Sequence, residues 1–200
     1  AVGDLTFVRA GSLKVVASAT DDLLPSSVAS GGGVISGTGA ATLLTSTLDA
    51  LVRVGDSADI EVDSSVTLDA YHFQDVDASA DAYSQAIAAG SGAGVYNFIG
   101  TSANVQVGDA DVTAQNILIS AENELSKFKF NNGDNLRSGS ASLVGATTLL
   151  SWTNVGLSTD KFEAIVDIMP GAVLTATGEG DESLLDISTT TAVTAIDSVN

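Results

Sequence analysis

Cysteine, proline, aromatic and basic residues are all scarce in this sequence of 200 residues. It has no Cys, and only 2 Pro, 6 Phe, 3 Tyr and 1 Trp. The absence of cysteine excludes disulfide bonds, thiolate metal sites and cysteine nucleophiles. Because large aromatic side chains are so few, a thick globular core would lack anchors, and the composition favours a thin, elongated core.

Basic residues are outnumbered by acidic ones. The chain has 7 Lys and Arg against 25 Asp and Glu, which gives a net charge of -18. Such a surface repels nucleic-acid phosphates and anionic lipid headgroups, so we expect no nucleic-acid partner. No run of about 18 apolar residues is present either, so we expect no membrane insertion.

What the sequence does contain favours sheet and turn. Hydrophobic residues make up 44% of the chain, and most of them are Ala, Val, Leu and Ile. Ser, Thr, Asp and the 20 Gly are abundant, whereas the residues that usually cover a soluble helix are rare. The composition therefore predicts an all-β protein whose corners are made by Gly, Asn and Asp.

An imperfect repeat runs along the chain. The segment Ala50-Leu51-Val52-Arg53-Val54-Gly55-Asp56 recurs at 103–109 and, more loosely, at 164–171, with intervals of 53 and 61 residues between the starts. A second short strand follows each copy, at 65–70, 116–121 and 183–188, and stretches rich in Gly, Ala and Ser separate the units. This pattern predicts stacked β-coils closed by glycine corners.

The repeat sets the expected domain organisation. We expect one β-solenoid segment over residues 1–200, with units at about 1–49, 50–102, 103–163 and 164–200, and belonging to a longer chain or a fibre. A β-helix coil commonly takes about 20 residues, so each unit would hold two or three coils. Nine or ten coils stacked at about 4.8 Å would form a rod of roughly 45 Å.

An antiparallel β-sandwich is the alternative fold. Several strands are apolar or small at successive positions, and both architectures produce this pattern. The Asn132-Gly133 pair, which follows Lys127-Phe128-Lys129-Phe130, is also a hairpin signal.

The repeat segments at 50–56, 103–109 and 164–171 resemble the repeats of large filamentous-haemagglutinin-like bacterial adhesins. The segment from Ala103 to Ala121 matches best, and the resemblance extends over roughly residues 48–177. It implies a right-handed parallel β-helix, export to the bacterial cell surface, and a stalk that presents adhesive regions. Partners would be further copies or flanking solenoid repeats, and a cell-surface or carbohydrate receptor. A self-assembling subunit of an extracellular fibre is an alternative.

Catalysis is not expected. His72 is the single histidine, so a Ser/His/Asp triad would have to include it. The Gly-x-Ser-x-Gly motif that would mark the serine nucleophile of such a triad is absent from the sequence. Polysaccharide-active enzymes also use parallel β-helices, and this class is the less favoured alternative. Trp152, in an apolar segment, is expected to lie in the core.

No cofactor is expected other than calcium. Asp75 and Asp77 alternate along a strand, with Asp81 nearby, and their carboxylates are the ligands that Ca²⁺ prefers. Two further acidic groups have similar spacing, namely Asp56 with Asp59 and Asp63, and Asp109 with Asp111. Neither standard calcium-loop motif occurs, so solvated turn residues are the competing interpretation of all three groups.

Overall fold

The computed structural model describes residues 1–127, 136–156, 159, 161–178 and 184–195. Thirteen strands and no helix lie in these ranges. Their bounds are β1 Phe7–Leu23, β2 Ser26–Ser46, β3 Asp49–Val54, β4 Asp59–Val76, β5 Ser79–Ile99, β6 Ser102–Val107, β7 Asp111–Ala114, β8 Asn116–Lys127, β9 Leu136–Ala141, β10 Val144–Val155, β11 Glu163–Ile168, β12 Val173–Ala176 and β13 Leu184–Ala195. The Asn132-Gly133 signal lies outside the described residues, and the described residues include no helix that could cross a membrane.

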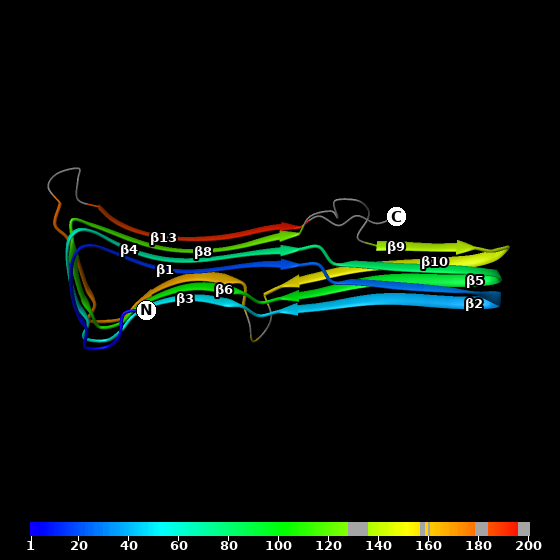
Figure 1. Ribbon diagram of the computed structural model, residues 1–200, viewed down its shortest axis with the longest axis horizontal. Coiled ribbons are helices and arrows are strands. Elements are labelled where there is room, and N and C mark those ends of the chain that lie inside the picture. The colour runs from blue at the N-terminus through cyan, green and yellow to red at the C-terminus, as the bar shows by residue number, and fades with distance from the viewer. Residues whose placement is uncertain (128–135, 157–158, 160, 179–183, 196–200) are drawn as a thin grey trace.

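The strands follow one another in circuits (Figure 1). β1, β2 and β3 form the first circuit, β4, β5 and β6 the second, β7 to β11 the third, and β12 and β13 begin a fourth. Each strand pairs with its counterpart in the next circuit, and every pairing between described strands is parallel. The antiparallel sandwich is therefore wrong as an alternative.

Each sequence repeat is one circuit. Ala103 of β6 is the register partner of both Ala50 in β3 and Ala164 in β11. The expectation of two or three coils per repeat, and of a rod of about 45 Å, is therefore wrong. The strands are longer than the motifs suggested, because Gly90, Gly92 and Gly94 lie within β5 and do not turn corners. Three to four stacked layers span only about 15 to 20 Å.

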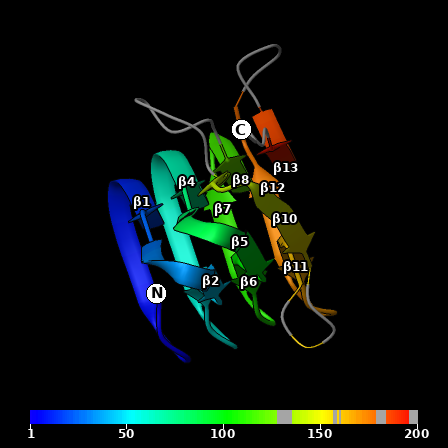
Figure 2. The ribbon, with the colours of Figure 1, turned by 90° about the vertical axis from the view of Figure 1, so that its right-hand side faces the viewer.

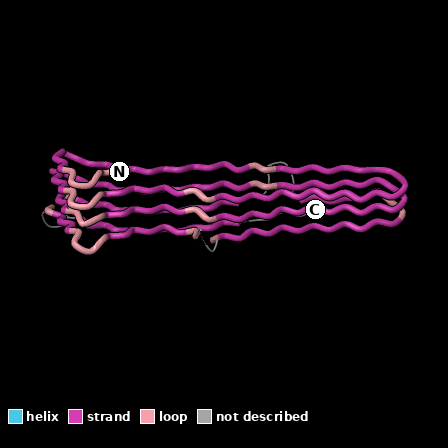
Figure 3. The backbone as a smooth tube through the Cα atoms, turned by 90° about the horizontal axis from the view of Figure 1, so that it is seen from below, coloured by secondary structure: helices cyan, strands magenta, loops and turns pink. Residues whose placement is uncertain are grey.

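The circuits are flattened into two layers (Figures 1 and 2). β1, β4, β8 and β13 lie in one layer, and β3, β6 and β11 lie in the other (Figure 1). β2 and β5 bend back at the far tip, so that their second halves return in the lower layer beside β10. The two halves of β2 approach closely, with Ser27 Oγ 2.9 Å from Thr42 Oγ1. Figure 3, seen from the lower layer, shows the strands running side by side across the molecule.

The interior consists of two apolar clusters with a polar seam between them. One cluster is built mainly from Val, Ile, Leu and Ala of β3, β4, β6, β7 and β8, and the other from β4, β5, β8 and β9. No Phe, Tyr or Trp side chain is among the buried described residues. The seam contains the fully buried His72, Gln74, Asn97, Thr101 and Asn123. Small and branched side chains suit the narrow space, since they pack efficiently between closely spaced sheets.

A ladder of aspartates fixes one corner of the circuits. Val-Gly-Asp occurs at 2–4, 54–56 and 107–109, and only the last two copies belong to the repeat that is visible in the sequence. Asp4 Oδ1 accepts a hydrogen bond from the Asp56 amide at 3.1 Å, and Asp56 Oδ1 accepts one from the Asp109 amide at 3.1 Å. Short acidic side chains favour such corners because they can cap exposed backbone amides.

Candidate functional site

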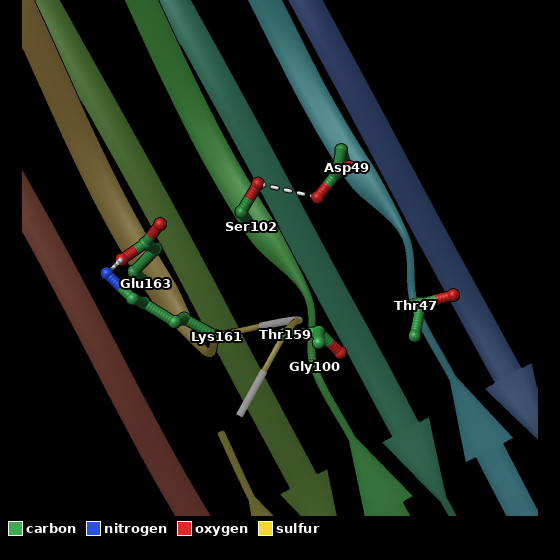
Figure 4. A pocket seen from close by; sticks show the side chains of 7 residues that line it. All are labelled: Thr47, Asp49, Gly100, Ser102, Thr159, Lys161 and Glu163. Carbon is green, nitrogen blue, oxygen red and sulfur yellow. Dashed lines mark hydrogen bonds and ion pairs between the residues drawn. The ribbon is translucent and has the colours of Figure 1, made fainter. Parts of the chain in front are cut away.

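A polar groove lies where the circuits pass into β3, β6 and β11. Asp49, Ser102 and Glu163 open these three strands and occupy one ladder position, so the register stacks them in a row (Figure 4). Thr47, Gly100, Thr159 and Lys161 complete the lining of the groove. The row exists only because residues 53 and 61 positions apart in the sequence are neighbours in the sheet.

Hydrogen bonds organise this groove. Ser102 Oγ donates to Asp49 Oδ1 at 2.6 Å and accepts a hydrogen bond from Asn104 Nδ2 at 2.6 Å. Lys161 Nζ lies 3.8 Å from Glu163 Oε2. The groove therefore presents carboxylates, a hydroxyl group and an ammonium group to a polar ligand. This arrangement can bind hydroxyl-rich molecules, because such ligands require both donors and acceptors.

His72 lies in the polar seam and is not among the residues that line this groove. Its imidazole is fully buried, and Nδ1 lies 3.0 Å from Asn123 Oδ1. Asn123 Nδ2 in turn donates to the backbone oxygen of Thr101 at 2.6 Å. Because Nδ2 is the donor group of the amide, the Asn123 oxygen accepts from His72 Nδ1. His72 is therefore held between the sheets as part of a structural hydrogen-bond network.

The candidate calcium ligands share one side of the chain. Asp75 lies near the end of β4, Asp77 follows that strand, and Asp81 lies in β5. All three occupy alternate positions and are partly exposed. Asp22 is the ladder neighbour of Asp75, and Arg137 is the ladder neighbour of Asp81. Over the described ranges, no group of three or more His, Cys, Asp or Glu side chains is arranged to hold a metal ion. Calcium binding by these residues stays a prediction.

The other acidic groups have different surroundings. Asp56 and Asp109 belong to the corner ladder. The Asp56 amide donates to the Asp4 carboxylate, and the Asp109 amide donates to the Asp56 carboxylate. Asp59 and Asp111 are ladder neighbours at the start of β4 and β7. The structure therefore assigns Asp56 a capping role that its spacing alone did not suggest.

The outer face of β4 and β8 carries a patch of acidic side chains with one tyrosine, which the sequence did not predict. Tyr71 and Glu122 are ladder neighbours, and Tyr71 Oη donates to Glu124 Oε2 at 3.4 Å. Burial, a hydrogen bond with Glu124 and the negative charges of Glu124 and Asp69 raise the pKa of Glu122. Burial, followed by the charges of Glu124 and Glu122, raises the pKa of Tyr71. Only the register between the two strands could have revealed this patch.

Replacing Glu122 with Gln should stabilise the protein at neutral pH. A raised pKa means that the folded state holds the proton more tightly than the unfolded state, so the ionised carboxylate opposes folding. The variant should gain less than about 1 kcal/mol in free energy of unfolding, because the site is partly exposed. This gain should be present above the raised pKa of Glu122 and should disappear as the pH falls below the ordinary pKa range of glutamate. Urea unfolding of both proteins across this pH range measures the difference. A gain that persists in acid would contradict the explanation.

Trp152 is exposed, so the expectation of a core position is wrong. Its side chain lies on the outer face of β10 with 54% of its surface exposed. Tyr96 of β5 is its ladder neighbour, and Leu43 of β2 is the next in the same row. The narrow interior between the sheets accepts small side chains at these strands, such as Ala93 and Ser91, and leaves no room for an indole ring.

No protein-family model, no curated protein and no solved structure matches the chain.

Proposed function

We infer that this chain is a section of a right-handed parallel β-solenoid that forms an extracellular structural and adhesive stalk on a bacterial surface protein. One observation carries the proposal. Each strand is bonded to its counterpart in the next circuit over most of its length, as in β2 and β5, where the register runs from Ser26 with Ser79 to Ser46 with Ile99. Backbone hydrogen bonds therefore run along the stacking direction and resist separation of the layers.

The open edges support continuation of the stack. Within the described part of the chain, β1 and β2 are paired on one side only, and the outer side of β3 is bridged only by Val2, which pairs with Val54. Val8, Leu13 and Val15 of β1 remain only partly buried at this edge, although they pack against the core. Unpaired strand edges readily accept further strands. Flanking solenoid repeats or another copy of the chain would fill them, which also supports the alternative of a self-assembling fibre subunit.

The broad outer faces supply the surfaces for adhesion. The groove around Ser102 combines donors and acceptors, and Trp152 projects from the same layer of the molecule. A cell-surface or carbohydrate receptor suits such polar and aromatic groups, whereas the net charge of -18 opposes nucleic acids. We propose binding in place of catalysis by a Ser/His/Asp triad, because the single histidine is enclosed between the sheets.

Duplicating one circuit tests the solenoid. A second copy of residues 59–110, inserted after Ala110, should fold, because Asp59 and Asp111 occupy the same ladder position. The inserted circuit should lengthen the stack by about 4.8 Å in small-angle scattering. It should also raise the urea m-value, since more surface becomes exposed on unfolding.

The control inserts only residues 59–76, which puts every later strand out of step with its neighbour. This variant should fail to fold cooperatively. If the full circuit disrupts the fold as severely as the single strand does, the solenoid is refuted. The extracellular role has its own test, since antibodies against the chain should label intact source cells, and labelling restricted to permeabilised cells would refute it.

A further inference from the structure

One face of this highly acidic chain has no charge. The returning half of β2 with the matching part of β5 and all of β10, residues 35–46, 88–99 and 144–155, contains no Asp, Glu, Lys or Arg. The outward side chains of these three segments form what we call the uncharged face. The net charge of -18 is thus carried entirely by other parts of the chain.

Beyond its first row, where Ile35 is 81% and Val144 73% exposed, the uncharged face has a low half and a high half. Gly39, Gly92 and Thr148 form one row across the three strands, and small residues also occupy the row before it. The high half contains the row of Leu43, Tyr96 and Trp152, whose large side chains project further from the sheet than the glycines do. Leu43 is 69% and Trp152 54% exposed. A shallow depression covers Gly92 and Thr148 and ends at Tyr96.

We propose that a second copy of this chain docks on the uncharged face around a two-fold axis. The axis would pass near the row that lies between the high and low halves, so that Leu43 and Trp152 of each copy would fill the glycine rows of the other. A two-fold contact uses the same surface on both copies, and such a surface must be complementary to itself. This inference depends on the sheet geometry and goes beyond the proposed stalk.

Charge and area both favour a second copy as the occupant. Two chains of this acidity repel one another wherever carboxylates meet, and the uncharged face is the broad surface on which they can approach without that cost. Twelve residues along three strands measure about 40 Å by 14 Å. Contact over this face would bury about 1,100 Å² on the two copies together, just above the lower bound of about 1,000 Å² for a specific interface.

Sedimentation velocity over a range of concentrations tests the proposal. The natural chain should be a reversible dimer, and the fluorescence of Trp152, the single tryptophan, should shift to shorter wavelength as the dimer forms. The double variant Gly39→Leu/Gly92→Leu fills the low half. It should fold normally, since a Cβ at either position would meet backbone oxygens no closer than 3.6 Å. It should weaken dimerisation by about 30-fold, the effect of an interface hot spot.

Gly11→Leu is the matched control. It adds the same side chain to β1, where a Cβ has nothing within 4 Å, and it leaves the uncharged face unchanged. Dimerisation equal to that of the natural chain is expected. A monomeric natural chain would overturn the proposal, and so would a monomer that binds neutral polysaccharide through Trp152. Association that Gly39→Leu/Gly92→Leu does not weaken would also overturn it and would point to the open strand edges.

Discussion

Asn123→Leu should lower the free energy of unfolding by about 4 kcal/mol. The fully buried Asn123 side chain bonds to His72 Nδ1, to the hydroxyl and backbone oxygen of Thr101, and to the backbone oxygen of Glu163. Leucine would leave these groups without partners between the sheets, where each unpaired polar group costs about 1 to 3 kcal/mol. Urea unfolding followed by circular dichroism measures the loss.

The control for Asn123→Leu removes the polar side chains together. The triple variant His72→Leu/Thr101→Val/Asn123→Leu removes two of the groups that Asn123→Leu leaves without partners. The triple variant should therefore regain at least about 1 kcal/mol of the stability that Asn123→Leu loses. A triple variant less stable than Asn123→Leu would show that the seam contributes through its shape and not through hydrogen bonding.

Gly108→Ala should cost about 3 kcal/mol of stability. A Cβ on Gly108 would lie 2.9 Å from the Gly55 carbonyl carbon and 3.0 Å from the Asp56 nitrogen, both of which are backbone atoms of the adjacent circuit. Backbone atoms cannot rotate away as a side chain can, so the corner ladder would have to open. The midpoint of urea unfolding reports the effect.

Gly37→Ala is the comparison for Gly108→Ala. Gly37 also lies in a described part of the sheet, but a Cβ there would meet nothing within 4 Å. This variant should be neutral or should stabilise the protein by up to about 1 kcal/mol, because alanine restricts the unfolded chain. Equal losses at the two glycines would contradict the close packing of corners between circuits.

The local character of the chain could be predicted from its sequence. Ala, Val, Ile and Thr without internal proline predicted strands, and the Val-Gly-Asp motif predicted corners at Gly55 and Gly108, both of which the structure confirms. The interval of 53 residues between Ala50 and Ala103 was also visible. The number of coils in that interval was not, because a glycine inside a strand and a glycine at a corner look alike in sequence.

The groups at the surface were harder to predict. The row of Asp49, Ser102 and Glu163, and the pair of Tyr71 with Glu124, join residues that are far apart in the chain. Trp152 was expected in the core because apolar residues flank it, yet the alternation of β10 directs it outward. A shift of one residue in register would reverse the face of every side chain, and local sequence does not fix that register.

Composition and local motifs establish that this chain is all-β, acidic and built from a repeat with glycine corners. The parallel pairing, the single circuit per repeat and the contacts between side chains of different circuits become visible only in the folded chain, because ladder hydrogen bonds join residues more than 50 positions apart. Their register is set by the packing of whole strands against each other, and no short segment of sequence contains that information.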